Sequence, residues 1–359
     1  MLKILFTLDY EIHGNGEGCA RELMVEPVTR LRRLFEEYGA RLTIMADMAE
    51  ILKFKQFADQ HGRDDYYYHD IVAQLQGAVR GGHDAQLHLH ASYFNATHDG
   101  RRWIQDWSEY NFAGLGLERM DQVVRIGKAG LESLLQPAAP DYRCFVFRAA
   151  NWSVNPGRNV VRTLLKNGIR IDTSIFKYGR RRGLVNFDYA RADHALIPWR
   201  VGPDDLCARD DRGSLWEFPI YSERRWIGAF LSPNRLYRVA QNRRHKIAGG
   251  PQIFRIPGRH KAANPLFLAA QRHAWKADFN QCTGRQLIGA LRRAEQRHAG
   301  GPDPLPFVLI GHSKLFNRRN ESSLRPFLEY VAARDSRFQF GTFSDFAIPE
   351  PVSPPETVL

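Results

Sequence analysis

Short apolar runs alternate with amphipathic segments along the first half of the chain, and each apolar run ends at a polar residue. Helices are predicted between the runs, from about Pro27 to Gly39 and from Asn155 to Gly168, because apolar residues recur there every three or four positions. Nearly continuous apolar character predicts buried strands at residues 3–8, 41–45, 85–89, 144–147 and 169–171. This alternation favours a parallel sheet or a β/α barrel.

The second half of the chain is less regular. Further strands are predicted at residues 215–218, 307–310 and 338–340, whereas the segment from about 221 to 300 is expected to be helical and basic. We expect one domain over residues 1–348, with residues 177–304 as an insertion or elaborated region. Residues 349–359 contain several prolines and are predicted to be a disordered tail.

The composition is that of a globular protein, with 43% hydrophobic and 25% charged residues. No apolar run approaches the roughly 20 residues of a membrane helix. Asp9 and Glu11 follow the first apolar run too early for a signal peptide, so we expect a cytoplasmic protein. The four cysteines are far apart, which favours neither a thiolate zinc site nor a disulfide framework.

The net charge of +12 is concentrated in one region. Residues 221–300 contain 16 lysines and arginines but only 3 acidic residues. Such a surplus predicts an anionic partner, namely an acidic glycan, a lipid-linked phosphate or the surface of a membrane contacted peripherally, with a merely solvated basic face as the alternative. Nucleic acid is not expected as a partner, because the sequence contains no nucleic-acid-binding motif.

Acids and imidazoles follow several of the predicted strands. Asp9 and Glu11 occupy alternate positions, as do His88 and His90, so each pair faces one side of an extended chain. A carboxylate with two imidazoles is a common ligand set for a divalent metal with open positions for water and substrate. The alternative for the two histidines is a hydrogen-bonded pair without metal.

The order of these motifs resembles that of the NodB-like polysaccharide deacetylases, a group of carbohydrate esterases. The resemblance covers roughly residues 1–176 and 305–345 and implies an α/β fold, a deformed (β/α)7-type barrel with a basic helical insertion. The motifs that carry it are FTLDYE (6–11), GHDAQLHLH (82–90), FRAANW (147–152), IDTS (171–174) and LIGHSK (309–314).

The resemblance implies a metal site built from Glu11, His88 and one further histidine. The family has its second ligand four residues after the first, where this chain has Ser92. His90 is the expected substitute, because a ring two residues along an extended strand can face the same ion. The expected cofactor is a divalent metal, with Zn²⁺ as the first choice.

The resemblance also assigns the catalytic groups. Asp9 matches the base that takes a proton from water, and Arg148 matches the arginine that orients it. His312 matches the general acid and Asp172 the acid that supports it. Other roles stay open, since Arg148 could be a structural ion-pair partner, Asp172 a turn residue and His312 an ordinary loop residue.

Aromatic residues near the strand ends are candidates for sugar binding. Tyr93 and Trp152 are the two that we expect to contact substrate, although most aromatic side chains belong to the core. The predicted function is metal-dependent removal of an acyl group from an N-acylated amino sugar of a surface polysaccharide precursor, such as an O-antigen (lipopolysaccharide) or capsule intermediate. The alternatives are an inactive glycan-binding barrel and a non-sugar amidohydrolase.

Overall fold

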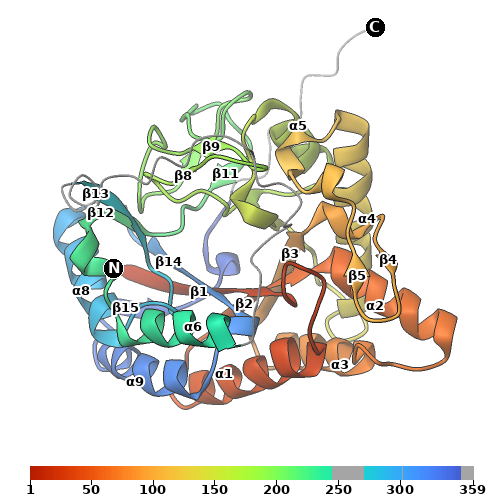
Figure 1. Ribbon diagram of the computed structural model, residues 1–359. Coiled ribbons are helices and arrows are strands. Elements are labelled where there is room, and N and C mark those ends of the chain that lie inside the picture. Colours follow the sequence, from red (N-terminus) through yellow and green to blue (C-terminus); the bar gives the residue numbers. More distant parts are fainter. Residues whose placement is uncertain (245–270, 301, 349–359) are drawn as a thin grey trace, which may run out of the picture.

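The computed structural model describes residues 1–244, 271–300 and 302–348, and its central feature is a curled sheet of nine strands (Figure 1). The strands follow one another in the order β10-β11-β7-β6-β3-β2-β1-β14, and β15 pairs with the start of β1. The pairings are parallel, except that β10 and β11 are antiparallel. The bounds are β1 (Leu2–Tyr10), β2 (Leu42–Asp47), β3 (Asp84–Leu89), β6 (Val146–Ala149), β7 (Ile171–Asp172), β10 (Trp199–Arg200), β11 (Trp216–Glu217), β14 (Leu305–His312) and β15 (Phe338–Phe340).

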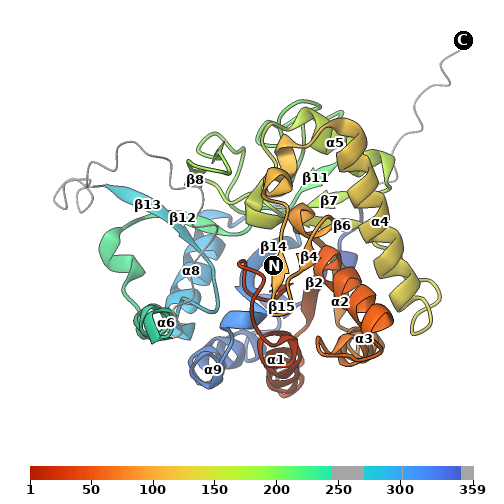
Figure 2. The same cartoon turned by 45° about the vertical axis from the view of Figure 1, so that its right-hand side comes forward.

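Helices surround the outside of this sheet (Figures 1 and 2). The first of them buries Val28, Leu31 and Leu34, which lie on one face at helical spacing. None of the helices in the described ranges is both long enough and apolar enough to cross a bilayer. The bounds are α1 (Glu26–Glu36), α2 (Met48–His61), α3 (Tyr68–Arg80), α4 (Leu117–Leu135), α5 (Arg158–Lys166), α6 (Pro233–Arg244), α8 (Gly284–Arg297) and α9 (Arg318–Ala332).

The register of the strands brings the polar strand ends to one edge of the sheet. Asp9 lies opposite His312 in the pairing of β1 with β14. His88 lies between Asp47 on β2 and Arg148 on β6. Because the strands are parallel, all of these side chains belong to the carboxyl end, where barrel enzymes carry their active sites.

The sheet curls back on itself beyond β11. Ile220 forms an isolated parallel bridge with Val308, and Asp278 forms another with Ile310. Both partners lie on β14, at the opposite end of the strand order from β10 and β11. These contacts explain the barrel-like shape, since residues from the second half of the chain continue the wall between β11 and β14.

The predicted α/β barrel and the eight predicted strands are confirmed, with shifts of a few residues at their ends. The segment 221–300 differs from expectation because it contains an antiparallel hairpin as well as helices. Two further strands in the expected insertion, β10 and β11, belong to the main sheet. Residues 349–359, the predicted tail, lie outside the described residues. The small hairpins pair β4 (Thr97–His98) with β5 (Trp103–Ile104), β8 (Arg180–Arg181) with β9 (Phe187–Asp188), and β12 (Ser222–Trp226) with β13 (Arg272–Lys276).

Candidate active site

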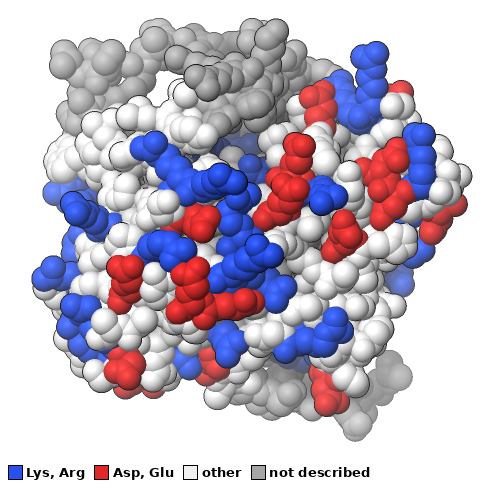
Figure 3. Space-filling view, turned by 90° about the horizontal axis from the view of Figure 1, so that it is seen from below, with Lys and Arg blue, Asp and Glu red and all other residues white. Residues whose placement is uncertain are grey.

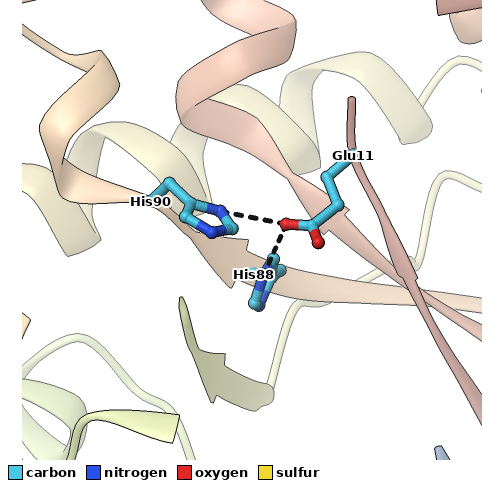
Figure 4. Close-up of side chains that lie close together, drawn as sticks. All are labelled: Glu11, His88 and His90. Atoms are coloured by element: carbon cyan, nitrogen blue, oxygen red, sulfur yellow. Dashed lines mark ion pairs between the residues drawn. The ribbon is translucent and has the colours of Figure 1, made fainter. Parts of the chain in front are cut away.

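Glu11, His88 and His90 converge at the carboxyl end of the sheet (Figure 4). Oε2 of Glu11 lies 3.5 Å from Nε2 of His88 and 3.2 Å from Nδ1 of His90. One potential ligand atom from each residue lies within 4.8 Å of the others. The Glu11 side chain follows β1, His88 is on β3 and His90 follows β3, so the expected use of His90 is geometrically feasible.

The donor set fits a divalent metal. One oxygen of Glu11 is 2.7 Å from Nζ of Lys314, while the buried Oε2 that faces the imidazoles has no hydrogen-bond partner in the described structure. Burial by itself would raise the pKa of Glu11, but Lys314, His90 and His88 hold it well below its usual value. A carboxylate whose lowered pKa favours the ionised form, aimed at two imidazoles, is a suitable divalent-metal site.

Outer partners fix both imidazole rings. Nδ1 of His88 is 2.9 Å from the carbonyl oxygen of Arg148, which accepts a hydrogen bond from this ring nitrogen. Nδ1 of His90 is 2.7 Å from Asp47 Oδ2, so Nε2 is the ring nitrogen that remains for a metal, and Asp47 also accepts a hydrogen bond from the backbone N–H of His90. Metal-binding histidines usually have a carbonyl or carboxylate partner of this kind.

Ser92, at the family's second ligand position, is not part of this group. Its hydroxyl donates a hydrogen bond of 2.8 Å to Gln105, and its side chain is buried. The chain keeps its extended direction for one residue beyond β3, and this residue is His90. Residue 90 still faces the carboxylate, whereas Ala91–Tyr93 form a short 3-10 turn that redirects the next side chains.

Asp9 and Arg148 form a buried ion pair beside the three candidate ligands. Nη1 of Arg148 lies 2.8 Å from Asp9, and its other donors reach the hydroxyl of Thr7 and the carbonyl of Thr173. Burial acts to raise the pKa of Asp9, but Arg148, His88 and His312 lower it more strongly. Asp9 is therefore an ionised carboxylate held in one orientation, as a general base requires.

His312 lies next to this base, with Nε2 at 3.5 Å from Asp9 Oδ2. Asn280 accepts a hydrogen bond from the His312 backbone, while the buried Nδ1 of the ring has no partner in the described structure. Burial lowers the pKa of His312, and Asp9 offsets this only in part. The lowered pKa favours the neutral form of this ring near pH 7.

Asp172 is placed apart from His312. Its buried carboxylate accepts hydrogen bonds from the backbone N–H and the hydroxyl of Ser174, and within the described ranges no hydrogen bond or ion pair joins it to His312. Its other neighbour is Glu217, whose pKa is raised well above the usual value by burial and by Asp172. This arrangement favours the turn-residue alternative over support of the acid.

The two predicted substrate-binding aromatics have different positions. Trp152 lines the cavity, with its ring 6.4 Å from that of His312 and with Lys276 Nζ 3.6 Å from its centroid. Tyr93 is fully buried, packs edge-on against His90 and is not among the described residues that line the cavity. The structure thus assigns Tyr93 to packing behind the candidate ligands.

Sequence reasoning missed several residues of the site. Lys314 stands in the quoted motif LIGHSK and Asp47 ends the second predicted strand, so both carried a signal. They were given no role because their partners are distant in sequence. The cavity measures about 440 Å³, and its lining combines the predicted groups with others, namely Asp9, Glu11, His13, Gly14, His88, His90, Tyr110, Asn151, Trp152, Arg181, Arg238, Asp278, Gln281, His312, Lys314 and Leu315.

Comparisons with known proteins bear on the fold. The sequence matches no family model and no curated protein. Among solved structures, a protein assigned as a polysaccharide deacetylase from Mycobacterium smegmatis is similar, with 14% identity, a TM-score of 0.50, and coverage of 96% of this chain and 88% of that one. A 4-alpha-glucanotransferase from Thermococcus litoralis is 12% identical with a TM-score of 0.51, covering 96% of this chain and 40% of that one. The chain therefore has the deformed barrel fold of the NodB-like polysaccharide deacetylases.

Proposed function

We propose that this chain is a metal-dependent amidohydrolase that removes an acyl group from an N-acylated amino sugar. The observation that carries the proposal is the placement of Asp9 and His312 beside Glu11, His88 and His90 in one cavity. A base, an acid and a metal-ligand set are the parts that hydrolysis of an amide by water needs. Glu11, His88 and His90 would hold a divalent ion, with zinc as the first choice.

The chemistry that such an ion supplies when bound is activation of water and polarisation of the acyl oxygen. The protein's own groups handle the protons. Asp9 accepts the proton of the attacking water, because Arg148 keeps the carboxylate ionised and fixes its direction. The new bond joins the water oxygen to the acyl carbon, and the bond from that carbon to the sugar nitrogen breaks.

His312 delivers a proton to the departing nitrogen. Because its ring is neutral at rest, it must first gain a proton, and Asp9 at 3.5 Å is the nearest donor once it has accepted one from water. The proton taken from water thus reaches the amine through two neighbouring side chains. This relay supports the proposal without the help of Asp172.

The proposed substrate is a precursor of a surface polysaccharide, such as an O-antigen or capsule intermediate, carried on a lipid or nucleotide in the cytoplasm. Supporting this is the basic surplus of residues 221–300, which suits phosphate, uronate or peripheral contact with a membrane. No acidic residue occurs between Arg224 and Arg244, a stretch that includes α6.

The test is hydrolysis by the purified chain with zinc or cobalt. We expect free amine from N-acylated amino sugars, its loss on chelation and its recovery on adding metal. A chain that binds no divalent ion would instead be an inactive glycan-binding barrel. Activity on small cyclic amides or formamides but not on sugars would indicate a non-sugar amidohydrolase.

A further inference from the structure

Three polar residues that the proposed chemistry does not use line the cavity beside the candidate metal ligands. Asn151 follows β6, Arg181 is on β8 and Arg238 is on α6. They come from three separate parts of the chain, and both arginines are half-buried. Each has a polar group for which the described structure supplies no matching partner.

The carboxylates that line the cavity already form ion pairs or hydrogen bonds with other groups. Asp9 is paired with Arg148 at 2.8 Å, and Glu11 with Lys314 at 2.7 Å. Asp278 accepts hydrogen bonds from two backbone N–H groups of the turn that follows it. No carboxylate of the cavity is therefore the counter-ion of Arg181 or Arg238.

Among the residues that the structure describes, the two arginines have no anionic partner. Arg181 donates a hydrogen bond of 3.0 Å to Oδ1 of Asn151, which is neutral. Arg238 forms no hydrogen bond or ion pair with any residue that the structure describes. A half-buried guanidinium without an anion loses solvation and gains nothing in return, so its placement favours a charged ligand.

The two arginines of this cavity differ from Arg325 on the outer face formed by α1 and α9. Figure 3 shows Lys and Arg interspersed with Asp and Glu on the face seen from below. There, Arg325 pairs with both Glu37 and Glu321. Arg325 is thus neutralised within the protein, whereas Arg181 and Arg238 have no ion pair among the described residues.

Asn151 provides an independent observation. Its Oδ1 accepts from the hydroxyl of Tyr110 at 2.9 Å and from Arg181, which fixes the orientation of the amide. The buried Nδ2 has no hydrogen-bond partner within the described ranges. Asn151 and Trp152 both have a left-handed backbone, with φ of 56° and 57°, and such strain is common where side chains are positioned for a ligand.

We propose that Asn151, Arg181 and Arg238 form a subsite for an anionic group of the substrate, either a carboxylate or a phosphate. The amide N–H of Asn151 and the two guanidinium groups donate hydrogen bonds to its oxygens, an arrangement suited to both groups. This inference rests on the proposed function and narrows its substrate class to acidic N-acylated amino sugars.

The first experiment compares a neutral sugar with two acidic ones. N-acetylglucosamine, its 1-phosphate and N-acetylmuramic acid, which has a carboxylate, are assayed with wild type and Arg238→Gln. We expect wild type to prefer at least one acidic sugar. In the variant, the ratio of kcat/KM for the acidic sugar to kcat/KM for the neutral sugar should fall about tenfold, which is the effect expected from losing one charge-assisted hydrogen bond. The loss should appear mainly in KM, and Arg238→Lys should restore part of it.

A matched control is Arg292→Gln, which removes one exposed arginine from α8, outside the cavity lining. It should leave the preference unchanged. An equal loss in both variants would show a general charge effect and overturn the subsite. Preference for the 1-phosphate identifies a phosphate ligand, and preference for N-acetylmuramic acid a carboxylate ligand.

A second experiment measures binding without turnover. Asp9→Asn loaded with zinc is titrated with the same three sugars by calorimetry, with and without Arg238→Gln. Tighter binding of an acidic sugar that the second substitution abolishes supports the subsite even if no sugar is hydrolysed, in which case only the proposed function fails. Equal affinity for neutral and acidic sugars, or no effect of Arg238→Gln, overturns the subsite.

Discussion

The two ends of β3 hold buried histidines in opposite chemical surroundings. His83, before the strand, accepts a hydrogen bond from the Leu42 backbone through Nδ1, and burial together with nearby arginines lowers its pKa to about 4. At the other end, burial also acts to lower the pKa of His88 and of His90, but nearby carboxylates raise both. The difference lies in the placement of acids, which the sheet collects at the carboxyl ends of its strands.

This contrast separates His83, a structural histidine, from the two candidate metal ligands. His83 is buried and accepts one backbone hydrogen bond at the amino end of β3, while His88 and His90 face a carboxylate with an unused oxygen. Strength of burial does not distinguish the two ends, because His83 and His88 are both buried. Substitutions at the two ends should therefore affect different measurements.

The largest effect is expected for Asp9→Asn. Loss of the base should lower kcat roughly 1000-fold, within the usual range for general base catalysis, while divalent metal stays bound. Turnover and metal content of the same preparation are measured, with circular dichroism to verify folding, since Arg148 loses its partner. His83→Gln is the control at the other end of β3 and should retain turnover. A folded Asp9→Asn variant with wild-type kcat would remove Asp9 from the mechanism.

His90→Ala should weaken metal affinity by more than about 100-fold, since even outer partners of metal ligands contribute about 10- to 100-fold. Competition with a chromogenic chelator measures the affinity. Ser92→Ala, two residues away, should leave it unchanged, because Ser92 donates only to Gln105. If Ser92→Ala proved the more damaging substitution, the choice of His90 as ligand would be wrong.

Asp47→Asn tests the outer partner of His90. We expect a loss of about tenfold in metal affinity, because an amide holds the imidazole less firmly than a carboxylate does. The measurement is the same chelator competition, and the loss must be smaller than that of His90→Ala. An unchanged affinity would show that the contact of 2.7 Å serves only packing.

The smallest effect is expected on the free energy of unfolding and comes from His83, at the amino end of β3. The pKa of His83 is about 4 in the folded chain and about 6.5 when unfolded, so the unfolded state binds more protons between these values. Stability is thus lost as the pH falls from 6.5 towards 4, by about 1.4 kcal/mol at pH 5.5. Urea unfolding at pH 7.5 and 5.5 measures it.

His83→Gln should reduce this loss by the same amount. The comparison with wild type is needed because Asp84 acts in the opposite direction. Burial raises its pKa to about 7, so the folded state binds the extra proton and stability falls as the pH rises from 4 to 7. An identical pH dependence in wild type and variant would contradict the assignment of a neutral, buried His83.

Much of the fold could be predicted because its signals are local. Each long parallel strand is an apolar run, and β1 is buried over nearly all of its length. The hairpin of β12 and β13 was missed because it pairs residues 222–226 with 272–276, and no local pattern indicates such a partner. The expectation of a helical segment therefore failed where pairing is distant.

In the candidate site, too, local sequence signals could be read, whereas contacts between distant residues could not. Asp9, Glu11 and His88 could be predicted from their positions after apolar runs, and the resemblance added roles for Arg148 and His312. Lys314 and Asp47 could not be assigned, because their importance depends on contacts across the barrel. The role proposed for Asp172 depended on a distance that no spacing in the sequence specifies.

The pairing of β1 with β14 also has a consequence for biosynthesis. The candidate metal ligands all lie within the first 90 residues, whereas His312 and Lys314 come more than 200 residues later, on or beside a strand that hydrogen-bonds to residue 7. A growing chain on the ribosome exposes the candidate metal ligands long before His312 is synthesised. The proposed activity therefore requires that β14 has emerged and paired with β1, so a chain that ends before β14 should lack this activity.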